Sequence, residues 1–183
     1  VSSTFNDLIE HRAALIKAIS GQELYPVVME NDSAKPGIDV IESSLQMVQK
    51  ASGYIGVISH RYGAIREDAE RNPNRLSLTE LEFREAQRLG RPILLFIMGD
   101  DHLVRPRDIE TDPEKITKLK AFRKYAKLPP NSSVSRIYTV FNNLTEFKAA
   151  AIQSIVELRR YLELQAAPPS PPSSPSSPSS PSP

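Results

Sequence analysis

Three glutamates lie close together in the segment 78–98, which reads LTELEFREAQRLGRPILLFIM. Glu80, Glu82 and Glu85 fall within six residues, directly before an apolar run with the composition of a buried strand. A carboxylate held in a partly desolvated site can stabilise a developing cation or exchange a proton with a substrate. The segment therefore raises the question of whether one of these glutamates is placed for chemistry.

Helical periodicity separates the three glutamates. At about 100° per residue, the predicted sheet-facing side consists of Leu78, Leu81, Ala86 and Leu89. Glu82 falls on this side, within the first two turns, and Glu85 lies about one turn deeper. Glu80 falls on the opposite, polar face with Arg84 and Gln87, where we expect a solvated charge that is favourable with the helix dipole.

The position predicted for Glu82 has two interpretations. Partial desolvation raises the pKa of a carboxylate and a nearby helix N-terminus lowers it, so the group could be tuned for catalysis. A structural carboxylate bound to Arg61, to a serine or to backbone amides would occupy the same position. The residues alone leave both interpretations open.

Helical and strand-like segments alternate along the chain. The first predicted helix runs from Phe5 to Ile19, with Phe5, Leu8, Ile9, Ile16 and Ile19 on one face and Ser2, Ser3 and Thr4 as caps. Further helices are predicted around Ile41–Val48, from Leu78, from Asp112-Pro113 to about Lys127, and from Asn143 to about Leu164. Strands are predicted at Leu24–Met29, Gly53–Ser59, Ile93–Met98 and Arg136–Phe141. This order predicts an α/β fold: an open three-layer sheet of about five mainly parallel strands with helices on both faces, the first strand being truncated near Val1.

Composition limits the classes of function. Residues 1–165 have the size of one domain, and residues 166–183 are a Pro/Ser-rich tract that we expect to be a disordered linker to a further domain. A net charge of +1 gives no general case for nucleic acid or membrane binding, and the absence of cysteine excludes thiolate chemistry and cysteine-ligated zinc. No apolar run approaches the length of a membrane span, and we expect a cytoplasmic protein.

Ligands of open parallel sheets bind at the carboxyl ends of the strands. The residues predicted there are Ser2-Ser3-Thr4, Glu30-Asn31-Asp32, Ser59-His60-Arg61-Tyr62 and Asp100-Asp101-His102. The three histidines are dispersed without metal-ligand spacing, so no metal and no cofactor is predicted. The chain contains neither a GxxxxGK[ST] phosphate loop nor a GxGxxG fingerprint.

Several blocks together resemble a known family. VSSTFNDLIEHRAALIKAI, SLQMVQKASGYIGVISHRYG and LSLTELEFREAQRLGRPILLFI are similar to domain-of-unknown-function family 4062 (DUF4062), found at the N-terminus of NACHT- or repeat-containing signalling ATPases of the STAND type. Within this similarity, PGIDVIESSLQMVQKASGYIGVISHRYG and EFREAQRLGRPILLF resemble segments of Toll/interleukin-1 receptor (TIR) domains. The resemblance implies a flavodoxin- or TIR-like fold and a role in signalling or innate immunity.

The resemblance also implies a role for Glu82. Catalytic TIR domains and nucleoside deoxyribosyltransferases carry a glutamate, four residues before a small residue and eight before Gly-Lys/Arg, that acts at the ribose of the substrate. Glu82 stands in that relation to Ala86 and Gly90-Arg91. The Trp-Cys pair that precedes the glutamate in many TIR domains is absent, a longer stretch follows Ser59, and Asp100–Asn131 carries an additional helix.

Three functions compete at this point. The first is an effector domain that cleaves the N-glycosidic bond of NAD or a related nucleotide when an attached ATPase oligomerises, as an NAD(P) glycohydrolase or nucleoside-hydrolase-like enzyme. Its substrate-binding residues would be Ser2, Ser3, Thr4, Glu30, Arg61 and Tyr62, and its catalytic residue Glu82. The second is a non-catalytic TIR-like module that self-associates through the loop Asn31–Gly37 and the adjacent helix, and the third is a nucleoside-transferring metabolic enzyme. A cavity beside Glu82 lined by Ser3 and Arg61 favours an enzyme, and an arginine-capped Glu82 without a cavity favours the module.

Overall fold

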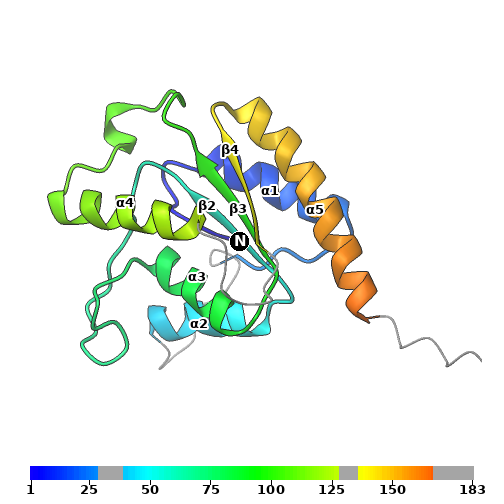
Figure 1. Cartoon of the computed structure of the whole chain (residues 1–183), viewed down its shortest axis with the longest axis horizontal. Coiled ribbons are helices and arrows are strands. Elements are labelled where there is room, and N and C mark those ends of the chain that lie inside the picture. Colours follow the sequence, from blue (N-terminus) through cyan, green and yellow to red (C-terminus); the bar gives the residue numbers. More distant parts are fainter. Residues whose placement is uncertain (29–38, 128–135, 167–183) are drawn as a thin grey trace, which may run out of the picture.

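The computed structural model describes residues 1–28, 39–127 and 136–166 as an α/β fold (Figure 1). Its elements are β1 (Ser2–Ser3), α1 (Ile9–Gly21), α2 (Val40–Lys50), β2 (Tyr54–Ile58), α3 (Leu78–Arg88), β3 (Ile93–Met98), the 3-10 helix η2 (Pro106–Asp108), α4 (Pro113–Lys127), β4 (Arg136–Phe141) and α5 (Leu144–Ala166). The alternation of helices and strands predicted from the sequence is therefore confirmed from α2 onward.

The four strands form one parallel sheet in the order β1-β2-β3-β4. Ser2 pairs with Gly56, and Tyr54 pairs with Ile93. Every residue of β2 and β3 is buried, as expected for central strands covered by helices on both faces. Helices α1 and α5 pack together over one face, and α2 and α3 lie together on the other (Figure 1).

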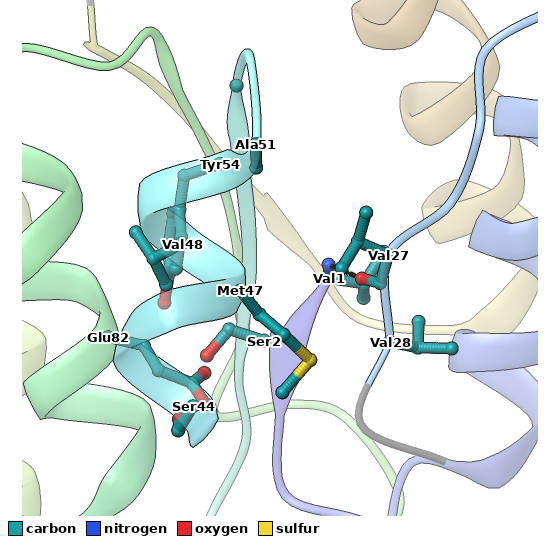
Figure 2. A pocket seen from close by; sticks show the side chains of 11 residues that line it. Val1, Ser2, Val27, Val28, Ser44, Met47, Val48, Ala51, Tyr54 and Glu82 are labelled. Carbon is teal, nitrogen blue, oxygen red and sulfur yellow. Dashed lines mark hydrogen bonds between the residues drawn. The ribbon is translucent and has the colours of Figure 1, made fainter. Parts of the chain in front are cut away.

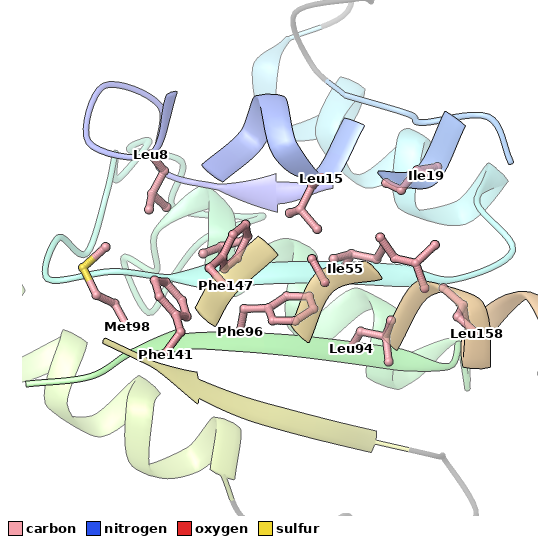
Figure 3. Close-up of a cluster of buried hydrophobic side chains, with 13 residues drawn as sticks. Leu8, Leu15, Ile19, Ile55, Leu94, Phe96, Met98, Phe141, Phe147 and Leu158 are labelled. Carbon is pink, nitrogen blue, oxygen red and sulfur yellow. The ribbon is translucent and has the colours of Figure 1, made fainter. Parts of the chain in front are cut away.

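Each face of the sheet has its own core. On the α1/α5 face, Leu8, directly before α1, and Leu15 within α1 belong to one cluster with Phe96, Phe141 and Phe147 (Figure 3). On the α3 face, the core consists of Tyr54, Ile58, Tyr62, Phe83, Ala86, Leu95, Leu119 and Phe122, among others. Helix α4 therefore packs on the same face as α3.

The strand predicted at Leu24–Met29 is wrong for its described part, because residues 24–28 have no strand structure. The Val1 nitrogen donates to the carbonyl of Val27 at 2.6 Å, so this segment runs beside β1 without forming a ladder. Pro26 contributes to the difference, since a proline has no N–H to donate. The described residues accordingly contain four strands rather than about five.

The predicted start and buried face of the first helix also need correction. Helix α1 begins only at Ile9, and Leu8 at its N-cap makes no side-chain capping bond. Ser2 and Ser3 form β1 instead. Phe5 and Ile9 are exposed, and the buried positions are Leu8, His11, Arg12, Leu15 and Ile19. The sheet therefore packs against the face of α1 that these buried residues form. This face carries fewer large apolar side chains than the predicted one.

The capping motif predicted for the last helix is confirmed. The amide nitrogen of Glu146 donates to Asn143 Oδ1 at 2.9 Å, and the Asn143 side-chain amide donates to Glu146 Oε1 at 2.7 Å. Helix α5 then continues to Ala166. Within the described ranges no helix is both long and apolar enough to cross a membrane.

Candidate functional site

Helix α3 carries the three glutamates and begins after Ser77, whose hydroxyl accepts from the Glu80 amide at 3.3 Å. Its buried face is centred on Phe83 and includes Thr79 and Ala86. The predicted face was different, because Leu78, Leu81 and Leu89 are only partly buried. The Phe83 ring packs edge-on to Tyr54, Phe122 and Tyr125, and these aromatic contacts fix the rotation of the helix.

Glu80 is not the solvated charge that the sequence predicted. It is 4% exposed and accepts a 2.7 Å hydrogen bond from the Tyr62 hydroxyl. Arg84 donates to its other oxygen from Nε at 2.9 Å and Nη2 at 2.7 Å. Arg84 in turn lies over the ring of Tyr125 on α4. The predicted polar face of α3 is thus an interface with α4, and Glu80 is a fully compensated structural carboxylate.

Glu85 is a polar contact between helices. Gln49 of α2 donates to Oε1 at 2.9 Å, and Arg88 reaches both carboxylate oxygens at 2.7 Å. The hydrogen bonds from Arg88 hold the pKa of Glu85 below its usual value. Glu85 therefore ties α2 to α3 and lies away from the ligand edge of the sheet.

Glu82 has partners of a different kind. The Ser44 hydroxyl of α2 donates to Glu82 Oε1, and the Ser2 hydroxyl of β1 lies beside the same carboxylate (Figure 2). Burial raises the pKa of Glu82, while the two serine hydroxyls and, to a smaller extent, the charge of Arg12 act in the opposite direction. Glu82 is partly buried, so its carboxylate is partly desolvated, and it is held mainly by neutral hydroxyl groups.

Tyr54 completes the wall on the sheet side. Ser2 pairs with Gly56, so Ser2, Gly56 and Tyr54 project to the same face. A Cβ atom on Gly56 would come within 2.9 Å of Tyr54 Cε1, so the missing side chain lets the Tyr54 ring lie there. Burial raises the pKa of the Tyr54 hydroxyl, and the Glu82 charge raises it further. Tyr54 therefore remains a neutral phenol next to the carboxylate.

Two cavities meet at Glu82. The smaller, of about 40 Å³, lies between β1, α2 and Tyr54 (Figure 2). The larger, of about 240 Å³, lies at the end of β1 and is bounded by α1 and by the N-terminus of α3. Polar side chains that line it are Ser2, Ser3, Arg12, Thr79 and Glu82, with Phe5 at one side. Glu82 thus borders a cavity at the carboxyl end of a parallel strand, where ligands of such sheets bind.

Arg12 brings a positive charge to this cavity from α1. It is 6% exposed, its Nη1 donates to Ser3 Oγ at 2.6 Å, and its guanidinium carbon lies 5.7 Å from the centre of the Phe5 ring. The charge of Arg12 also lowers the pKa of Glu82. The larger cavity consequently has an anionic side and a cationic side.

Only some of the residues predicted to bind substrate lie at the cavity beside Glu82. Ser2 and Ser3 line the cavity beside Glu82. Thr4 is turned toward Ser59, with 3.2 Å between their hydroxyl oxygens, and Arg61 donates to the carbonyl of Arg107 at 2.9 Å. Tyr62 is buried against Glu80, and neither Arg61 nor Tyr62 lines either cavity. Glu30 and the loop Asn31–Gly37 lie outside the described residues.

The remaining polar residues at this edge of the sheet form a second group. Arg123 of α4 donates to the carbonyls of Ser59 and Met98 and lies 3.4 Å from Asp100. His11 packs against His102, and burial lowers its pKa to about 4, so it is neutral at physiological pH. In the described part of the chain no cluster of three or more histidine, aspartate or glutamate side chains could hold a metal ion.

Sequence reasoning missed Arg12, Ser44 and Tyr54. A usable signal existed for Arg12, because it interrupts the spacing Leu8, Leu15, Ile19 at a position where an apolar residue is expected. A second signal was the Tyr54–Gly56 pair, since a glycine inside a strand often marks a close approach by another group. Ser44 carried no comparable signal, because only the packing of α2 on α3 brings it to Glu82.

Comparison with known proteins agrees with the sequence blocks described above. A family model described as "Domain of unknown function (DUF4062)" matches residues 1–156. No curated protein and no solved structure gives a significant match. The match covers most of the 183 residues, including every residue of the two cavities. The chain therefore belongs to the DUF4062 family.

Proposed function

We propose that the domain cleaves the N-glycosidic bond of NAD or a related nucleotide, with Glu82 as the catalytic carboxylate. The observation that carries the proposal is a partly desolvated carboxylate held by hydroxyl groups and bordering a cavity at the ligand edge of the sheet. A carboxylate in a tight ion pair, such as Glu80, would have its charge compensated already. Glu82 keeps its negative charge available to a ligand.

The chemistry requires little beyond that charge. The C1′–N bond breaks with its electron pair leaving on nicotinamide, which departs as a neutral molecule. The ribosyl group left behind has oxocarbenium character, which a nearby carboxylate stabilises electrostatically. A water molecule then adds to C1′ and releases a proton, so NAD and water give ADP-ribose, nicotinamide and a proton. No metal or redox cofactor enters this balance.

The resemblance to TIR domains supports a signalling context for this activity. We include in the proposal that an attached STAND/NACHT-type ATPase controls it by oligomerisation. The assay should therefore use the protein both as a dispersed domain and as an enforced oligomer, for example fused to a defined trimeric or larger scaffold.

Nicotinamide release from NAD tests the proposal. We expect release by the oligomer and at least a roughly 100-fold lower rate in Glu82→Gln, which keeps the shape of the side chain and removes its charge. Glu85→Gln is the matched control, because Glu85 lies on the same helix and lines neither cavity. Equal release by the native protein and by folded Glu82→Gln would contradict the role of Glu82 and would favour a non-catalytic assembly module.

A further inference from the structure

The larger cavity has a feature that cleavage of a glycosidic bond does not by itself require. Arg12 reaches it from α1 and is only 6% exposed, beside His11 on the buried face of the helix. Burying a guanidinium group is costly, and the cost is offset only where the group is paired and hydrogen-bonded. Ser3 and the Phe5 ring hold Arg12 in one orientation.

A second polar group, the Ser2 hydroxyl, lines the same cavity. Ser2 Oγ is shielded from solvent and lies beside the Glu82 carboxylate, whose ionised form it favours. The cavity therefore combines a forked cation, a hydroxyl able to bind a ligand oxygen, and the Glu82 carboxylate.

We propose that Arg12 binds a phosphoryl group of the substrate, so that the site selects ribosyl phosphates over the corresponding nucleosides. This inference rests on the proposed function and specifies the substrate class for the same site. A guanidinium group matches phosphate with two parallel hydrogen bonds. Glu82 repels phosphate and attracts the ribosyl cation. The charges of Arg12 and Glu82 therefore orient a ribosyl phosphate with its phosphate toward Arg12 and its ribose toward Glu82.

The size of the cavity agrees with this orientation. About 240 Å³ is less than the roughly 300–1,000 Å³ of pockets that enclose a whole ligand. The cavity has room for a ribosyl phosphate, and the base and the rest of a dinucleotide extend out of it past Phe5, which is 54% exposed. The assignment also replaces Arg61 as the phosphate ligand, since Arg61 contacts the carbonyl of Arg107 instead.

Equilibrium binding of adenosine monophosphate (AMP) and adenosine, measured by calorimetry, tests the inference without any turnover. The native protein should bind AMP at least about tenfold more tightly than adenosine. Arg12→Lys keeps the charge but loses the fork, so it should weaken AMP binding by about tenfold and leave adenosine binding unchanged. Arg61→Lys is the matched control and should change neither affinity.

Inorganic phosphate gives an independent test on the unaltered protein, which remains decisive if Arg12→Lys does not fold. It should compete with AMP and leave the affinity for adenosine unchanged. Equal affinities for the two ligands, binding of neither, an equal loss of both in Arg12→Lys, or the same loss in Arg61→Lys would overturn the inference.

The two proposals fail in different ways. Cleavage of NAD by a protein that binds AMP and adenosine equally would remove the role of Arg12 and leave that of Glu82. Preference for AMP in a protein that never releases nicotinamide would establish the phosphate site and remove the proposed catalysis.

Discussion

Glu80 and Glu82 lie two residues apart on α3, where Glu80 is buried and Glu82 is partly buried, and their surroundings differ. Glu80 accepts from Tyr62 and from two nitrogens of Arg84, so its charge is compensated within the α3–α4 interface. Glu82 is held by serine hydroxyls from α2 and β1 and borders a cavity. Desolvation of a carboxylate therefore does not identify a functional residue. The cavity beside Glu82 makes the difference, because a serine partner alone also fits a structural carboxylate.

The largest effect on stability should come from Glu80. Glu80→Gln removes the charge that Arg84 pairs with and weakens the acceptor for the buried Tyr62 hydroxyl, so we expect a loss of about 2–3 kcal/mol in the free energy of unfolding. Urea denaturation measures this loss. A double-mutant cycle with Tyr62→Phe should give a coupling free energy of about 1 kcal/mol, and strict additivity would show that the pair is not coupled.

Glu82→Gln should change stability in a pH-dependent manner instead. Burial raises the pKa of Glu82 above its usual value of 4.5, so the folded protein binds that proton more tightly than the unfolded chain does. The raised pKa makes its full contribution to the free energy of unfolding below pH 4.5, where Glu82 is protonated in both states. This contribution is lost as the pH rises through the higher pKa of the folded state. Glu82→Gln does not lose this stability, because the glutamine side chain does not ionise.

The difference in unfolding free energy between Glu82→Gln and the native protein should therefore move in favour of the variant as the pH increases from 4 across this window. Denaturation at a series of pH values measures the change. A difference that is independent of pH, or that moves against the variant, would contradict the account of Glu82.

Ser44→Ala should have the smallest effect. The Ser44 hydroxyl favours the ionised form of Glu82, so its loss raises the pKa of Glu82 further and shifts the rise of activity to higher pH. The cost in stability should be about 1 kcal/mol, typical for one hydrogen bond. The pH dependence of nicotinamide release measures the shift, with Ser43→Ala as the neighbouring control. A shift toward lower pH would contradict the role given to Ser44.

Much of the fold could be predicted because its signals are local. The runs at Tyr54–Ile58 and Ile93–Met98 are apolar throughout, and the Asn143–Glu146 capping motif marks the start of α5 by itself. The segment 24–28 failed, because apolar composition does not reveal whether a neighbouring strand will pair with it. A truncated first strand was predicted near Val1, but Ser2 and Ser3 were predicted to be caps of the next helix and not part of that strand, since two residues are too few for a periodic pattern.

The candidate site was predictable only in part, for a similar reason. Helical periodicity placed Glu82 near the ligand edge, where the structure also has it. The environment of Glu80 depends on Tyr62 from a distant loop and on packing against Tyr125, and no local pattern contains either contact. Arg12 reaches the cavity because α1 rests on the sheet through a face that includes a charged residue.

Carboxyl carbon-13 NMR titration of Glu82, assigned by comparison with Glu82→Gln, tests most directly whether Glu82 differs from the ion-paired Glu80. A partly desolvated carboxylate that is held by neutral hydroxyl groups resists ionisation, so we predict a pKa above 4.5 for Glu82. A phosphorylated ligand bound next to it, such as AMP, should raise that pKa further through its negative charge. Titration of Glu82 at or below 4.5 would show a solvated or ion-paired carboxylate and would contradict the account.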